Sequence, residues 1–154
     1  AFHHRSVFIK SGLEKSASLA ETVASELSMI ESAIFTEPDD QSAWWYHQFL
    51  LTWAASQVAA GAGAQAEWFV GLLQQQVGLM DKLLDIESGS KWALLCIVAI
   101  IDHILGPACM QHLLATNPEC LASWKDRKNS VLMQLIELDP SHAARYRYLL
   151  GRTR

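Results

Sequence analysis

Charged residues are scarce in this sequence, and so are residues that interrupt helices. Of 154 residues, 18% are charged and 51% are hydrophobic, a balance that excludes a disordered chain. Twelve Lys and Arg against sixteen Asp and Glu give a net charge of -4, which argues against general binding to the nucleic-acid backbone. The apolar content suffices for one packed core, so residues 1–154 are expected to form a single domain.

Paired cysteines and long apolar runs are also missing. Cys96, Cys109 and Cys120 are odd in number and form no C-x-x-C pair, which indicates reduced thiols and a cytoplasmic location. The longest apolar run, residues 93–101, is much shorter than the roughly 20 residues that a membrane helix needs. It therefore predicts a buried core helix and no membrane insertion.

The sequence is rich in helical periodicity. Apolar residues at spacings of three and four predict helices over residues 20–35, 42–60, 65–86 and 122–138, and a short last helix ends near residue 151. Residues 91–105 are apolar on nearly all sides, which predicts a helix buried between its neighbours. The four prolines fall at the pauses in this periodicity. Because no alternation of apolar and polar residues is long enough for a strand, the fold class is all-α.

One layout recurs three times: an amphipathic helix, an acidic turn, and a second helix that an aromatic residue opens. The acidic residues, 50 and 52 positions apart, and their aromatic followers are Glu37 with Trp44, Glu87 with Trp92, and Asp139 with Tyr146. A helical hairpin of this kind cannot bury its apolar face alone, so neighbouring hairpins stack. The pattern predicts a curved solenoid of antiparallel helical hairpins.

Residues 26–47, and above all the segment TEPDDQSAWWYH at residues 36–47, closely resemble a late repeat of the alpha subunit of Rab geranylgeranyltransferase. The pattern in that family is roughly T-[DE]-P-x-D-Q-S-x-W-x-Y-H. The segments FHHRS at residues 2–6, KWALL at residues 91–95 and LDP at residues 138–140 are similar to further parts of the family pattern. Phe2 stands in the place of a tryptophan and Ser88 in the place of a proline. The continuation QFLL at residues 48–51 is more similar to fungal than to animal members.

The resemblance implies a protein prenyltransferase alpha-subunit fold and a shared enzymatic role. The chain is expected to be the non-catalytic alpha-subunit portion of a heterodimer that transfers geranylgeranyl from geranylgeranyl diphosphate to C-terminal cysteines of Rab GTPases. Implied partners are the beta subunit, a Rab escort protein and the Rab GTPase. Zinc is expected in the beta subunit, and no cofactor in this chain. The isolated chain is expected to be inactive, because the family's lysine and histidine near the diphosphate belong to earlier repeats.

The beginning of the sequence adds an expectation about its extent. It carries no initiating Met, and its first residues match the middle of a hairpin. The chain is therefore expected to be the C-terminal part of a longer alpha subunit, with an apolar amino-terminal face that a preceding repeat would cover.

No residue is expected to be catalytic, cofactor-binding or metal-binding. Cys109 and His112 form a lone C-x-x-H without a second pair of ligand spacing, so zinc is not expected there. The aromatic residues Trp44, Trp45, Tyr46 and Trp53 predict core packing between hairpins. The candidates for contact with a partner or between repeats are His3, His4, Arg5, Trp44, Tyr46, His47, Lys91 and Trp92.

The basic residues near the end of the chain need no binding partner to explain them. Cations at a helix C-terminus are stabilised by its partial negative charge, which we expect for this set: Arg145, Arg147, Arg152 and Arg154.

Two other functions remain open at this point. One is a non-enzymatic helical-repeat scaffold, although tetratricopeptide arrays have a period near 34 residues that this spacing does not match. The other is the alpha subunit of a farnesyl or type I geranylgeranyl transferase, which shares the architecture. The segment DDQSAW at residues 39–44 favours the Rab geranylgeranyltransferase alpha subunit over the scaffold. The Lys91-Trp92 and Asp139-Pro140 pairs resemble the Rab enzyme better than the farnesyl or type I enzymes.

Overall fold

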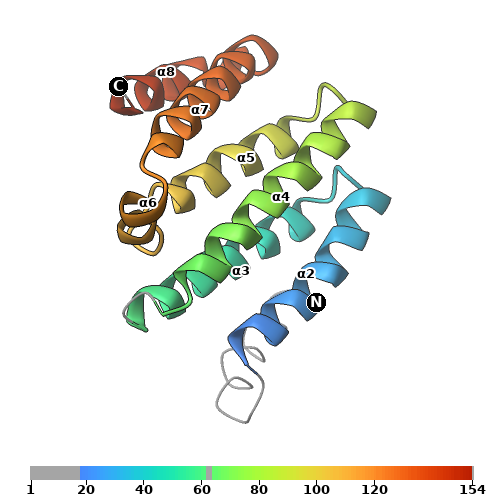
Figure 1. Cartoon of the computed structure of the whole chain (residues 1–154). Helices are drawn as coiled ribbons and strands as arrows, with labels where there is room; N and C mark the ends of the chain where they lie inside the picture. The colour runs from blue at the N-terminus through green and yellow to red at the C-terminus, as the bar shows by residue number, and fades with distance from the viewer. Residues whose placement is uncertain (1–17, 62–63, 154) are drawn as a thin grey trace.

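The computed structural model describes residues 18–61 and 64–153, which are helical and contain no strand. Figure 1 shows the helices, which are α2 (Leu19–Thr36), α3 (Gln41–Ala60), α4 (Ala66–Ile86), α5 (Lys91–Ile104), α6 (Met110–Thr116), α7 (Glu119–Leu138) and α8 (Ala143–Thr153), with a short 3-10 helix η2 (Pro140–His142) before the last. The all-α prediction is confirmed. The sequence did not predict α6, and α7 begins three residues earlier than expected.

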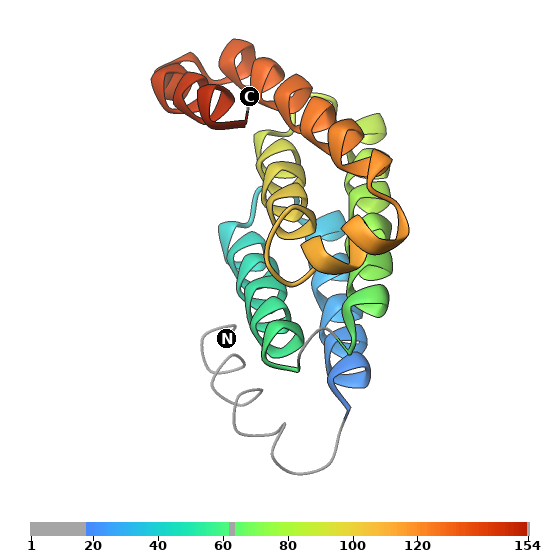
Figure 2. The same ribbon diagram turned by 60° about the vertical axis from the view of Figure 1, so that its left-hand side comes forward.

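The helices form hairpins that stack. α2 pairs with α3, α4 with α5, and α7 with α8, and α5 also packs against α3 and α7. Figures 1 and 2 show α2 and α4 side by side in one layer and α3 and α5 in a second layer, with the α7–α8 hairpin stacked on α5. This arrangement confirms the predicted solenoid of helical hairpins. No helix in the described ranges combines the length and the apolar character needed to cross a bilayer.

The three acidic turns share one backbone geometry. The φ/ψ angles are -135°/81° at Glu37, -129°/81° at Glu87 and -133°/69° at Asp139. In each turn the backbone N–H of the acidic residue donates to the carbonyl four residues earlier, at 2.8–2.9 Å. Its own carbonyl then accepts from the N–H three residues later, at 3.1 Å. The recurring layout is therefore a structural repeat.

A fourth turn of this kind was missed from the sequence. Asn117, between α6 and α7, has φ -156° and ψ 68°, and its N–H donates to the Leu113 carbonyl at 2.8 Å. Asn117 replaces the acidic residue, and the helix before it has only seven residues. The short helix gave too little periodicity to identify.

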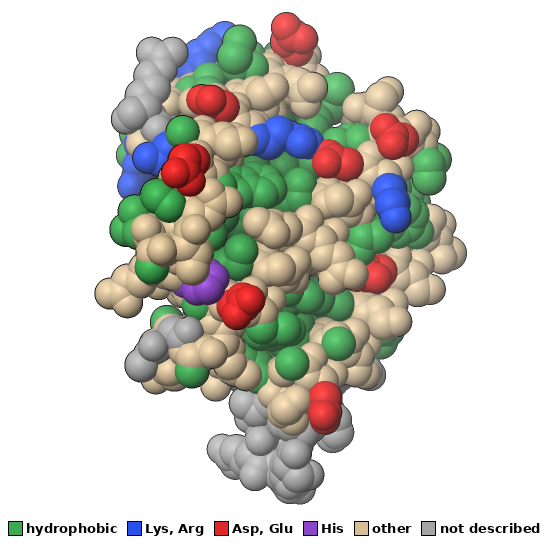
Figure 3. Space-filling view, viewed as in Figure 1, with side chains coloured by type: hydrophobic (Ala, Val, Ile, Leu, Met, Phe, Trp, Pro, Cys, Tyr) green, Lys and Arg blue, Asp and Glu red, His purple; other side chains and the backbone are tan. Residues whose placement is uncertain are grey.

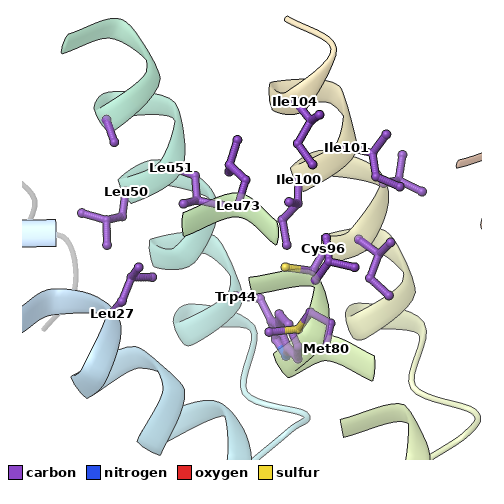
Figure 4. Packing of buried hydrophobic residues seen from close by; sticks show 14 of the residues in the cluster. Leu27, Trp44, Leu50, Leu51, Leu73, Met80, Cys96, Ile100, Ile101 and Ile104 are labelled. Carbon is purple, nitrogen blue, oxygen red and sulfur yellow. The ribbon is translucent and has the colours of Figure 1, made fainter. Parts of the chain in front are cut away.

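The core follows the same period. The buried positions 23, 26, 27 and 30 in α2 recur 50 residues later at 73, 76, 77 and 80 in α4. The buried positions 43, 44, 46, 47, 50 and 51 in α3 recur at 93, 94, 96, 97, 100 and 101 in α5. Figure 4 shows side chains of this set meeting between the helices, with Trp44 of α3 beside Met80 of α4. Two hairpins thus contribute matching faces to one continuous core.

The aromatic residues of α3 divide between the core and the surface. Trp44, Tyr46 and Trp53 are buried, as predicted. The prediction for Trp45 was wrong, because its side chain is 69% exposed. Successive residues on an α-helix point about 100° apart, so Trp44 and Trp45 cannot both face the same neighbour.

We predict opposite outcomes for the two adjacent tryptophans. Trp44 is 3% exposed and its indole N–H donates to the Pro38 carbonyl at 2.7 Å. Trp44→Ala should lower the free energy of unfolding by about 3–5 kcal/mol. Trp45→Ala, the matched control, should change it by less than about 0.5 kcal/mol. Denaturant unfolding followed by circular dichroism measures both, and equal losses in the two variants would contradict this account of the packing.

Candidate functional site

The eight residues singled out from the sequence fall into three groups. His3, His4 and Arg5 lie outside the described residues. Lys91 and Trp92 open α5, where both are partly exposed. The remaining three, which are Trp44, Tyr46 and His47, are all buried on the inner face of α3. Those three side chains contact neighbouring helices of this chain and are closed to an outside partner in this structure.

Tyr46 joins the two helices of the first hairpin. Its hydroxyl donates to Oε2 of Glu26 on α2 at 3.0 Å, and Glu26 is itself only 7% exposed. A buried carboxylate is tolerated only when hydrogen bonds replace its water. The pair explains why a charged residue occupies an otherwise apolar face of α2.

His47 joins the first hairpin to the second and is the centre of the site. Its ring is fully buried on α3. Nε2 lies 2.9 Å from Oε1 of Gln76 on α4, and Nδ1 lies 3.5 Å from Sγ of Cys96 on α5. The Gln76 amide nitrogen in turn donates to Oε1 of Glu31 on α2 at 3.0 Å. We call these four residues, Glu31, Gln76, His47 and Cys96, the polar joint.

The hydrogen bonds of the polar joint run in one direction. Because the Gln76 amide nitrogen donates to Glu31, its carbonyl oxygen faces His47 and accepts from Nε2–H. Nδ1 of the neutral ring is then an acceptor, so the Cys96 thiol donates to it. The chain of donors therefore starts at a buried thiol and ends on the partly exposed Glu31 carboxylate.

Burial keeps the inner members of the joint uncharged. Desolvation lowers the pKa of His47, with a smaller contribution in the same direction from His103, against the hydrogen bond to Gln76. Desolvation also raises the pKa of the Cys96 thiol. A neutral imidazole and a protonated thiol are the forms that the hydrogen bonds require. A thiol held in this form is a poor nucleophile, so the geometry suits a structural role.

The equivalence between repeats explains how the joint is built. At an offset of 50 residues, Gln76 corresponds to Glu26 and Cys96 to Tyr46. In the first hairpin the two equivalent residues bond each other directly. In the second hairpin they receive His47 of the first hairpin between them. The His47 ring thus takes the place of a direct bond between Gln76 and Cys96, and it connects the first hairpin to the second.

A second connection links the last two hairpins at their turns. The Asp139 carboxylate accepts from the Tyr146 hydroxyl at 2.7 Å and lies 2.9 Å from Nδ1 of His142 and 3.4 Å from Nζ of Lys91. The hydrogen bonds from Tyr146 and then His142 hold the pKa of Asp139 well below its usual range. Desolvation and the bond to Asp139 raise the pKa of Tyr146 to about 12. Lys91 also lies over the ring of Trp92, 5.5 Å from its centroid.

Sequence reasoning did not single out Gln76, Cys96 or Asp139 as contact residues. A signal for Gln76 was present, because the 50-residue period places it at the position of the buried Glu26. In the part of the chain that the structure describes, no three His, Cys, Asp or Glu side chains converge in a way that could hold a metal ion.

These features define an all-helical repeat protein whose hairpins are connected by buried polar groups. Residues 23–54, which span most of α2 and most of α3, match the protein prenyltransferase alpha subunit repeat. The chain is 28% identical over 160 residues to the geranylgeranyl transferase type-2 subunit alpha of Schizosaccharomyces pombe, covering 97% of this chain and 44% of that protein. The resemblance stated from the sequence is confirmed.

Other similar proteins are also type-2 alpha subunits. The chain is 25% identical over 131 residues to the type-2 subunit alpha of Dictyostelium discoideum, covering 85% of this chain and 35% of that protein. It is 46% identical over 39 residues to the human type-2 subunit alpha, covering 25% of this chain and 7% of that protein. The chain spans less than half the length of these relatives.

The polar joint predicts a loss of stability in mild acid. The unfolded chain binds a proton at His47 near pH 6.5, whereas the folded chain resists protonation. Stability should therefore be constant above that pH and fall below it, with His47 contributing up to about 1.4 kcal/mol per pH unit. Urea unfolding at several pH values between about 7.5 and 5 measures this dependence.

Variants separate the contribution of His47 to the pH dependence of stability from that of the other histidines. His47→Gln should weaken the dependence on pH, and the remainder should come from His103, whose pKa burial also lowers. His112→Gln, the matched control outside the joint, should keep the slope of the parent. A parent protein of constant stability across this pH range would contradict the role given to His47.

Proposed function

We propose that this chain is the non-catalytic alpha-subunit portion of a type II protein geranylgeranyltransferase. Together with a beta subunit, such an enzyme transfers geranylgeranyl from geranylgeranyl diphosphate to C-terminal cysteines of Rab GTPases, which an escort protein presents. The observation that carries this proposal is the similarity to type-2 alpha subunits along 97% of the chain, together with the matched repeat. The expected zinc ion belongs to the beta subunit and supplies activation of the acceptor thiol there.

The geometry supports a scaffolding contribution. The polar joint and the Asp139 cluster connect successive hairpins, so the stack can present a fixed surface to a partner. The same features would suit a non-enzymatic repeat scaffold. The type-2 relatives favour the transferase over that alternative and over the farnesyl-type alpha subunit.

One side of the molecule has the properties of a subunit interface. The turns at residues 37–40, 87–90 and 139–142 lie at the same end of their hairpins (Figure 1), and we call this side the turn edge. The residue before two of these turns is an exposed apolar side chain, Ile86 at 72% and Leu138 at 44%. A shallow hollow of about 430 Å³ beside the first turn is lined by Met29, Ala33 and Glu37, among others. Figure 3 shows hydrophobic side chains open to solvent between α2 and α4.

We propose that the beta subunit covers the turn edge. An exposed apolar patch rimmed by polar residues is typical of a surface that binds another protein, and we propose that Ile86 and Leu138 belong to such a patch. The two exposed residues lie at the ends of α4 and α7, so a partner that covers them would bridge two hairpins.

Co-expression with a beta subunit tests the proposed function. We expect the two chains to co-elute in size-exclusion chromatography, and the complex to melt at a higher temperature than the chain alone, since a partner that binds the folded state stabilises it. The purified chain alone should transfer no labelled geranylgeranyl to a Rab protein. Transfer by the chain alone, or separate elution of the two subunits, would contradict the proposal.

A pair of variants tests the turn edge. Ile86→Ser combined with Leu138→Ser should weaken binding to the beta subunit by about tenfold or more, because both lost side chains would lie in the interface. Leu114→Ser, on α6 away from the turn edge, removes a side chain that is also exposed and should change binding by less than about twofold. Unchanged binding by the double variant would show that the partner contacts another side.

A further inference from the structure

The exposed face of α8 is basic and aromatic. Arg145, Tyr148 and Arg152 lie within about 60° of one another around the helix, Arg147 lies about 160° from Arg145 at the other margin of the exposed side, and α8 contains no acidic residue. Tyr148 is 62% exposed, and the Arg152 guanidinium lies 5.8 Å from the centroid of its ring. This concentration of positive charge contrasts with the net charge of -4 on the whole chain.

The helix itself does not account for these charges. Only Arg152 lies in the last turn of α8, where a cation is favourable. Arg145 lies in the first turn, where the helix dipole disfavours cations, and Arg147 lies in the middle of the helix, where the dipole has little effect. The expectation that the whole cluster stabilises a helix C-terminus was therefore wrong for these two residues.

Internal ion pairs do not account for them either. Lys91, Arg127 and Lys128 each lie within 4.0 Å of a carboxylate, on Asp139, Asp81 and Asp102 respectively. Within the described residues, none of Arg145, Arg147 and Arg152 has such a partner. In the described part of the chain these cations are thus left without an ion pair, and Arg145 also lies where its own helix disfavours it.

The opposite face of α8 limits what can bind. Ala143 and Tyr146 are buried against the rest of the protein, and Leu149 and Leu150 pack against the core. A helix that inserts into a bilayer needs a free apolar face, and α8 has none to offer, so only a contact through its charged side chains remains open. An acidic protein segment needs only the exposed face, where arginines pair with carboxylates and Tyr148 supplies contact area.

We propose that the exposed face of α8 is a docking surface for an acidic segment of a partner protein. Charge complementarity identifies the occupant, since the cations on this face have no acidic neighbour in α8 and the chain as a whole is negative. An acidic partner is repelled by the rest of the surface and attracted to α8, which fixes where it docks. The inference is independent of the proposed transferase function.

Fluorescence anisotropy with a labelled oligoglutamate peptide tests this proposal. The full chain, alone or in complex with its beta subunit, should bind the peptide at low salt, lose affinity as salt is added, and not bind an oligoglutamine peptide of equal length. Arg145→Gln combined with Arg152→Gln, the two arginines on the same face as Tyr148, should weaken binding by about tenfold. The matched control, Lys82→Gln with Lys125→Gln, removes two exposed cations elsewhere and should change affinity by less than about twofold.

Variants of Tyr148 test the docking surface without changing the net charge of the protein. Tyr148→Ala should weaken peptide binding severalfold, and Tyr148→Phe should retain it, because the ring and its contact with Arg152 remain. Circular dichroism of each variant checks that the fold is intact.

Four outcomes would overturn the proposal. The first is that the acidic peptide does not bind at low salt, and the second is that the arginine and lysine variants lose equal affinity. The third is that the protein binds phosphatidylserine vesicles in place of the peptide, with the same dependence on the arginines. The fourth is that the protein forms a concentration-dependent dimer that the arginine variant abolishes. The last two would assign the surface to a membrane or to a second copy of this chain.

Discussion

The apolar face that each hairpin leaves open toward its neighbour is the constraint on which this structure depends. α5 shows it best, since it is buried along most of its circumference and packs against α3, α4 and α7. A helix of that composition has no stable place in an isolated hairpin, because its own partner α4 can cover only one side. Stacking is therefore a condition of folding for the second hairpin, and the first and third hairpins supply its two covers.

Apolar contacts alone would leave the stacking poorly defined, because one row of Leu and Ile side chains fits another at several positions. The polar joint removes this freedom. A shift of one helical turn, about 5.4 Å, would separate His47 from Gln76 and Cys96 and leave buried polar groups unpaired. Each such group costs about 1–3 kcal/mol, which is large beside the stability of a small domain. The joint therefore selects one alignment of the two hairpins.

Most of the fold could be predicted from the sequence, because helices of 14 to 21 residues carry enough periodicity to be identified. The seven-residue α6 does not, and it was missed. The burial of Trp44 and the exposure of Trp45 depend on helical phase, which a run of adjacent aromatic residues does not reveal. The partners of His47 are 29 and 49 residues away, and only the stacked fold brings them together.

The hydrogen bonds of the segment that carries the family resemblance are made within the chain. Asp40 caps α3, Trp44 bonds the turn carbonyl of Pro38, Tyr46 bonds Glu26, and His47 forms the joint. These residues specify a hairpin and its attachment to the next hairpin, and none of them needs a partner protein to explain it. Sequence similarity in this segment alone thus indicates a shared hairpin fold and not a shared partner. Partner choice has to depend on exposed positions, which can change without disturbing the core. The turn edge, with the exposed Ile86 and Leu138 beside it, and the basic face of α8 are positions of that kind.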